Sequence, residues 1–107
     1  MPSATLPTAQ ELLEGIRNAL TITWNDAYTN QSLTGIIARG IAFLDEIAGV
    51  QLDYSVEGKA RELLINYCQY ARSNALDQFS INYREDLTFF QLGEEVKRHE
   101  EADDSAV

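Results

Sequence analysis

The sequence has few of the residues on which most protein chemistry depends. Cys68 is the only cysteine and His99 the only histidine among 107 residues. One cysteine cannot form an internal disulfide, so nothing indicates an oxidising compartment. The chain contains no Cys-x-x-Cys motif, no Gly-rich phosphate loop and no zinc-type spacing. No apolar run approaches the roughly 20 residues that span a bilayer, and the start lacks the basic and apolar regions of a secretion signal.

Catalytic residues are equally scarce, so we expect no enzyme, no metal and no cofactor. His99 lies in a strongly charged stretch, which is typical of a solvated surface histidine rather than a general base. Cys68 falls on the apolar face of a predicted helix, where a cysteine behaves as a small hydrophobic residue. Adjacent acids such as Asp45 and Glu46 point in different directions on a helix, so their spacing does not suit a metal.

Acidic residues outnumber basic residues and are concentrated toward the end of the chain. The net charge is -9, and twelve of the 17 acidic residues lie in residues 51–107, six of them between Glu94 and Asp104. An acidic protein is repelled by phosphate backbones, which disfavours specific DNA binding. The same repulsion suits a surface that DNA slides past without adhering.

Helical periodicity accounts for the first half of the chain. Thr8 and Glu11 have capping-box spacing and predict a helix over Ala9–Leu20. Residues 21–32 are rich in turn formers and are predicted to form a loop tucked under by Trp24. A second helix is predicted over Leu33–Ala48, with Gly49 as its C-terminal cap. It carries two neighbouring apolar faces, which suggests contact both with its own core and with another subunit. The second face, our candidate subunit interface, consists of Ile36, Gly40, Phe43 and Ile47.

Helical periodicity continues in the second half of the chain. A third helix is predicted over Val56–Ser73, capped by Ser55, and Asn74 marks a break after it. Apolar residues at spacings of three and four then predict a last helix or helix pair, with a possible kink at Asn82, ending at Gly93. The connector Val50–Val56 is predicted to be anchored by Leu52 and Tyr54. Tyrosine is enriched at protein contacts, so Tyr28, Tyr54 and Tyr70 are also candidates for an interface.

The fold class is therefore all-α, a small bundle of about four helices. We expect a flexible leader over residues 1–7, a helical domain over residues 8–93 and an acidic tail over residues 94–107. The tail lacks an apolar stripe, so we expect it to become ordered only against a partner.

An ordered set of motifs resembles the small head–tail connector (adaptor, head-completion) proteins of long-tailed bacteriophages and prophages, over about Leu12 to Leu92. The most specific motif is Leu63-Leu64-x-x-Tyr67-x-x-Tyr70-Ala71-Arg72-Ser73-Asn74-Ala75-Leu76-x-x-Phe79-x-x-x-Tyr83-x-x-x-Leu87. It is preceded by Leu20-Thr21-Ile22-Thr23-Trp24, Leu33-x-x-x-Ile37, Ile47-Ala48-Gly49 and Leu52-Asp53-Tyr54.

The resemblance implies a structural, non-enzymatic subunit that forms a ring under the portal protein, at the head–tail junction of a virion assembled in the bacterial cytoplasm. Such a ring extends the DNA channel without binding DNA specifically, and it offers a docking surface to head-closure or tail-completion proteins. The residues implied to hold the fold are Trp24, Leu64, Tyr67, Tyr70, Arg72, Phe79, Tyr83 and Leu87. The residues implied to contact the portal are Glu94, Glu95, Lys97 and Arg98.

Two other functions are compatible with parts of the pattern. An acidic helical inhibitor or antitoxin-like protein that binds a basic partner fits the charge and the tail, but leaves the motif from Leu63 to Leu87 unexplained. A DNA-binding packaging subunit fits less well, because the sequence shows no basic patch.

Overall fold

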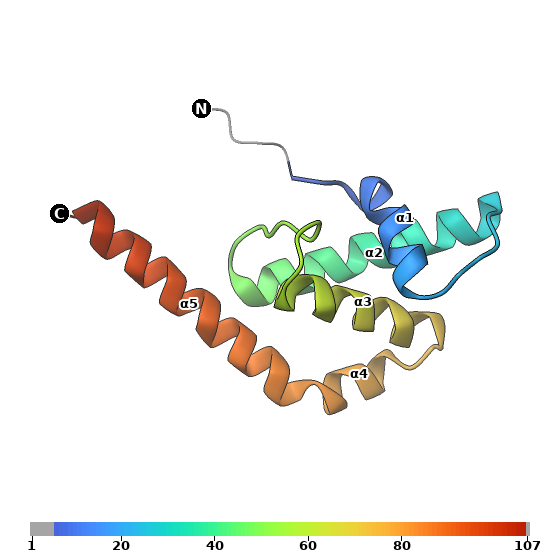
Figure 1. Cartoon of the computed structure of the whole chain (residues 1–107). Helices are drawn as coiled ribbons and strands as arrows, with labels where there is room; N and C mark the ends of the chain where they lie inside the picture. Colours follow the sequence, from blue (N-terminus) through green and yellow to red (C-terminus); the bar gives the residue numbers. More distant parts are fainter. Residues whose placement is uncertain (1–5, 107) are drawn as a thin grey trace.

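The computed structural model describes the backbone of residues 6–106 and the side chains of residues 6–97. Within that range the chain is all-helical, as predicted, with five helices rather than about four (Figure 1). Their bounds are α1 Ala9–Ala19, α2 Ala27–Ala48, α3 Lys59–Arg72, α4 Leu76–Asn82 and α5 Arg84–Ala106. Of the predicted leader, residues 1–5 lie outside the described part of the chain.

Helix α1 begins where its capping residues predict. The Glu11 backbone amide donates to Thr8 Oγ1 at 3.2 Å, and the Thr8 amide donates to Glu11 Oε1 at 2.9 Å. This reciprocal pair satisfies amides that have no partner inside the helix. The capping-box prediction is confirmed.

Helix α2 begins at Ala27, six residues before the predicted start, so the loop prediction for residues 27–32 is wrong. Asp26 is the N-cap: its carboxylate accepts from the Thr29 amide at 2.8 Å and from the Thr29 hydroxyl at 2.9 Å. Asp is as typical of helix starts as of turns, which is why the pattern was ambiguous. Gly49 ends the helix with φ 79°, as predicted.

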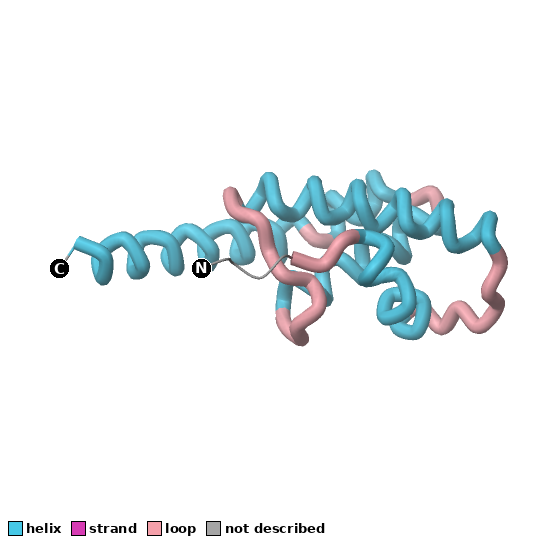
Figure 2. Tube along the Cα trace, turned by 90° about the horizontal axis from the view of Figure 1, so that it is seen from above, coloured by secondary structure: helices cyan, strands magenta, loops and turns pink. Residues whose placement is uncertain are grey.

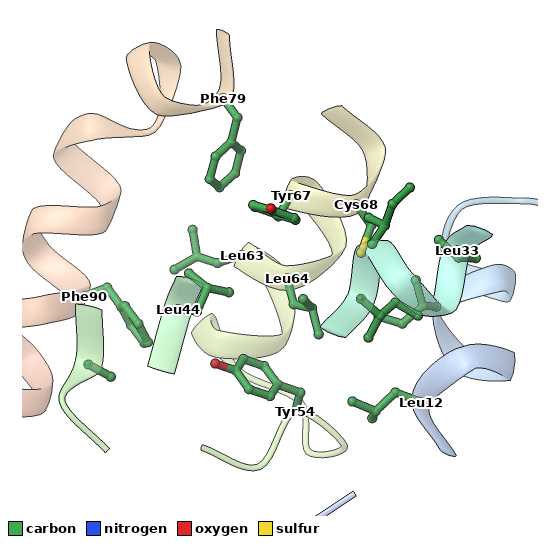
Figure 3. Packing of buried hydrophobic residues seen from close by; sticks show 14 of the residues in the cluster. Leu12, Leu33, Leu44, Tyr54, Leu63, Leu64, Tyr67, Cys68, Phe79 and Phe90 are labelled. Carbon is green, nitrogen blue, oxygen red and sulfur yellow. The ribbon is translucent and has the colours of Figure 1, made fainter. Parts of the chain in front are cut away.

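Helix α2 lies at the centre of the fold and contacts α1, α3 and α5 (Figure 1). Side chains from all five helices and from both long connections form one buried core (Figure 3). The fully buried large residues are Ile16, Leu33, Ile37, Leu44, Tyr54, Leu63, Leu64, Cys68 and Phe79. The molecule measures 53 × 36 × 18 Å, and α5 extends well beyond the other helices (Figure 2).

The connection between α2 and α3 is held by Tyr54. Its ring is buried, and its hydroxyl donates to Asp45 Oδ1 at 2.7 Å. The Leu52 amide donates to the same oxygen at 3.2 Å, and Arg61 Nη1 donates to the Tyr54 carbonyl at 2.9 Å. Tyr54 therefore anchors the connection, as predicted, and its alternative role at a protein interface is wrong.

Two predicted helix ends also need correction. Helix α3 begins at Lys59 after Gly58, and Ser55 bonds Asp53 Oδ1 instead of capping the helix. Helix α5 does not end at Gly93 but continues to Ala106. Gly93 has open space around it, so a helix can pass through it at a propensity cost of about 1 kcal/mol. The predicted break near Asn82 is confirmed, because α4 ends there and α5 starts at Arg84.

Candidate interaction surfaces

The second apolar face of α2 is occupied by the chain itself. Ile36 and Gly40 are buried, and a Cβ on Gly40 would lie 2.7 Å from Leu64 Cδ1 and 2.8 Å from Tyr67 Cδ1. Phe43 is half-buried with its ring 5.6 Å from that of Tyr67, and Ile47 is half-buried against the same core. The prediction of a subunit interface on this face is corrected: its partner is the body of the same chain, chiefly α3.

The family-motif residues divide into two groups. Leu64, Tyr67 and Phe79 are buried, while Tyr70, Tyr83 and Leu87 are half-buried and pack against the core. The Phe79 ring stacks on Tyr83 with centroids 4.9 Å apart and meets Tyr67 and Tyr70 edge-on at 5.6 and 5.7 Å. Such ring pairs add stability beyond the area that they bury. For these six residues the predicted fold-holding role agrees with their packing.

Trp24 and Arg72 are the exceptions, because neither is part of the core. Trp24 is 51% exposed, and the Arg72 guanidinium lies 6.0 Å above its ring. Two hydrogen bonds hold Trp24: the indole Nε1 donates to Thr29 Oγ1 at 3.3 Å, and the Trp24 backbone carbonyl accepts from Arg17 Nη2. The prediction that Trp24 tucks under its loop as a core anchor is therefore wrong.

We name Trp24, Arg72 and Tyr28 the Trp24 patch: the Arg72 guanidinium lies over the Trp24 ring, and Tyr28 follows Trp24 by four residues in the chain. Tyr28, on the first turn of α2, is 82% exposed. A guanidinium over an indole face is a cation–π contact and holds both groups in one orientation. The patch is thus a partly pre-organised surface with a large apolar area facing water.

A second exposed surface lies where α5 passes the connection before α3. We name it the α5 groove; it has a volume of about 490 Å3. Its apolar lining consists of Leu52, Val56, Ala60, Phe89, Phe90 and Gly93. Phe90 points into the core toward Leu44 (Figure 3), whereas Phe89 and Val56 are mostly exposed. Leu92 and Val96, also exposed, continue the apolar stripe along α5, and the missing side chain of Gly93 keeps the groove open.

Charged residues surround the α5 groove, and most of them are paired. Lys59 Nζ lies 3.7 Å from Asp86 Oδ2, and Lys97 Nζ lies 3.3 Å from Glu94 Oε2. The Glu57 side chain is 97% exposed and 3.7 Å from the Arg61 Nε, so it remains accessible to a partner. The Lys59 and Asp86 side chains are about half exposed, and pairs of that kind stabilise the fold by about 0–1 kcal/mol.

The four candidate portal-contacting residues lie at different depths. Glu94 is a wall of the α5 groove with only 13% of its side chain exposed. Glu95 and Lys97 face solvent. The side chain of Arg98 lies outside the described residues. Glu94 and Lys97 thus line the apolar α5 groove, a position that the charge pattern alone did not indicate.

Among the described side chains, no group of three or more His, Cys, Asp or Glu is placed to hold a metal ion. Burial raises the pKa of the Cys68 thiol to about 12, which keeps it protonated and unreactive. Burial also raises the pKa of the Tyr54 phenol, and its bond to Asp45 raises it further, so this buried donor stays protonated.

The helices show no membrane-spanning character either: none in the described part of the chain is long and apolar enough to cross a bilayer. Two surfaces on the described part of the molecule are candidates for partner contact, the Trp24 patch and the α5 groove. Sequence reasoning missed the groove because it joins residues 52–60 to residues 89–97, which only the fold brings together. Comparisons of the chain with protein-family models, with curated proteins and with solved structures give no match.

Proposed function

We propose that the protein is a structural subunit of a phage head–tail connector, which assembles as a ring under the portal protein. In this role it extends the DNA channel and presents a docking surface to a head-closure or tail-completion protein. The proposal places it at the head–tail junction of a virion, with the portal, the next head-completion protein and further copies of itself as partners.

The observation that carries the proposal is the uncovered apolar surface left after the core is complete. Among the exposed large hydrophobic residues, Trp24 and Tyr28 belong to the Trp24 patch, and Val56 and Phe89 line the α5 groove. Leu92 and Val96 lie further along α5, and Ile81 lies outside both surfaces. Clustered exposed apolar residues with a polar surround mark protein–protein contacts. A subunit of an assembly needs such surfaces, whereas an enzyme needs reactive groups.

Two further features support the same function. The motif from Leu63 to Leu87, which carries the resemblance, forms the corner of α3, α4 and α5 and supplies much of the aromatic packing. The net charge of -9 would keep packaged DNA from adhering to a channel wall.

Light scattering on a sizing column tests the proposal with this protein mixed with the portal protein encoded nearby. We expect one large particle with many copies of this chain per portal. Separate elution at several salt concentrations would contradict the connector function. It would favour the acidic inhibitor or antitoxin-like protein, whose partner would be basic.

A charge-reversed pair of variants tests the portal-contacting region. Glu95→Lys changes an exposed acid on α5, and Glu46→Lys makes the same change on an exposed position of α2. We expect Glu95→Lys to weaken portal binding and Glu46→Lys to leave it unchanged. Equal behaviour of the two variants would exclude residue 95 from the portal contact.

A further inference from the structure

The Trp24 patch and the α5 groove differ in character and lie far apart on the same molecule. The loop that carries Trp24 leads into the N-terminal end of α2, whereas the connection before α3 leaves the C-terminal end of this 22-residue helix, and α5 extends away on that side (Figure 1). The patch of one chain therefore cannot reach the groove of that chain. An occupant of either surface must come from another molecule.

The patch has the composition of an energetically dominant contact. Trp, Tyr and Arg are the three residue types most enriched where alanine substitution abolishes binding. Trp24, Tyr28 and Arg72 supply one of each, and Trp24 and Tyr28 are 51% and 82% exposed. Aromatic side chains of this kind bind best in apolar recesses from which water is excluded.

The groove provides such a recess with the complementary charge. Its lining is apolar, with Val56, Phe89 and Ala60 in its walls. Its volume of about 490 Å3 is within the range of roughly 300–1,000 Å3 found for binding pockets. Glu57, on its edge, presents a carboxylate that is 97% exposed, which suits a guanidinium such as that of Arg72.

We propose that the Trp24 patch of one copy docks into the α5 groove of a second copy, so that Trp24 and Tyr28 enter the groove and Arg72 pairs with Glu57. Because the two surfaces differ, the contact is head-to-tail, and each added copy leaves a free patch and a free groove. Repetition of such a contact produces a ring or a filament rather than a closed dimer. The inference rests on the proposed function, since it names the surfaces by which subunits of the ring meet.

Charge exchange tests the pairing. We expect Arg72→Glu to weaken self-association about tenfold in sedimentation velocity, and Glu57→Arg to do the same. The double variant restores the pairing with reversed polarity and regains most of the affinity. Arg39→Glu, the same change at an exposed position of α2 outside both surfaces, is the matched control and retains wild-type association.

Tyr28→Ala tests the aromatic contribution without touching the core, because Tyr28 is 82% exposed. We expect a loss of roughly thirtyfold in association, as for a dominant contact residue, with an unchanged thermal melt. Variants with one added surface cysteine test the orientation, because the native Cys68 is buried: mixing Tyr28→Cys with Val56→Cys chains gives disulfide-linked mixed pairs, while neither variant alone forms pairs. Pairs formed by Tyr28→Cys alone would show a symmetric contact and overturn the head-to-tail arrangement.

The same variants separate this inference from the proposed function. If the wild type assembles on the portal and both Arg72→Glu and Tyr28→Ala assemble equally well, the inference fails and the connector function stands. If the portal never binds, yet self-association follows the charge exchange, the function fails and the inference stands. A wild type that neither self-associates at high concentration nor yields mixed cross-links overturns the inference.

Discussion

The close approach of α2 and α3 at Gly40 predicts opposite effects for the same substitution at two sites of one helix. Gly35→Ala and Gly40→Ala each gain about 1 kcal/mol of helix propensity. At Gly35 the only neighbour that a new Cβ meets is Arg39 Nη1, at 3.5 Å, the end of a flexible side chain. Gly35→Ala should therefore stabilise the protein by about 0.4–1 kcal/mol.

At Gly40 the new methyl group has no room. It would lie 2.7 Å from Leu64 Cδ1 and 2.8 and 3.2 Å from two Tyr67 ring atoms, whereas carbon atoms prefer about 3.5–4.0 Å. Both neighbours are buried, so relief requires α3 to move away. An extra methyl group in a packed core costs about 1–3 kcal/mol. When the propensity gain is subtracted from this steric cost, Gly40→Ala should lower the free energy of unfolding by about 0–2 kcal/mol.

Urea unfolding followed by circular dichroism measures both variants against the wild type. We expect Gly40→Ala to be less stable than Gly35→Ala by about 1–3 kcal/mol, which is the steric term alone. The comparison is matched, because residue type, helix and propensity gain are the same. Equal stabilisation by the two substitutions would refute the packing of α2 on α3 described above.

Two further predictions concern groups whose pKa is shifted. Burial raises the pKa of Cys68 to about 12, so a thiol reagent at mildly alkaline pH should leave the folded protein unlabelled and label one thiol in urea; rapid native labelling would contradict the burial. Hydrogen bonds from Thr29 hold the pKa of Asp26 below its ordinary value of 3.8. The ionised Asp26 cap therefore stabilises the fold fully above pH 3.8, and this stabilisation is lost as the pH falls through the lowered pKa of the folded state. The melting temperature of Asp26→Ala should accordingly lie below that of the wild type at neutral pH, with the gap closing in acid; a gap constant over the whole range would contradict the cap.

The parts of the fold that the sequence predicted are those with local signals. The Thr8 and Glu11 capping box and the Gly49 C-cap are each defined within a few residues, and both are where the pattern places them. The start of α2 was missed because its first turn carries an exposed Tyr28 and polar residues, and therefore shows no hydrophobic periodicity. The wide apolar arc of α2 correctly indicated two contacts, but which molecule supplies the second contact is decided by tertiary packing.

The interaction surfaces were harder to predict for the same reason. A tryptophan is as compatible with a core as with a contact surface, and only the fold shows that Trp24 is half exposed beside Arg72. Tyr28 was predicted to lie at an interface; it is 82% exposed, and the interface itself stays a prediction. For Tyr54 the sequence left an anchoring and an interfacial role open, because its partner Asp45 lies nine residues away on α2. The acidic tail was predicted from charge alone. That prediction missed the continuation of α5 through the tail and the groove beside it.

The docking of α5 on α2 has a consequence for how the molecule folds and opens. Helix α5 returns to α2 through Phe90, across the intervening α3 and α4. Closing that long segment carries a loop-entropy cost. We therefore expect α5 to dock last during folding and to detach first, at a free energy below that of global unfolding. Hydrogen exchange should then show α1, α2 and α3 as the slowest-exchanging unit, with α5 as a separate, faster one.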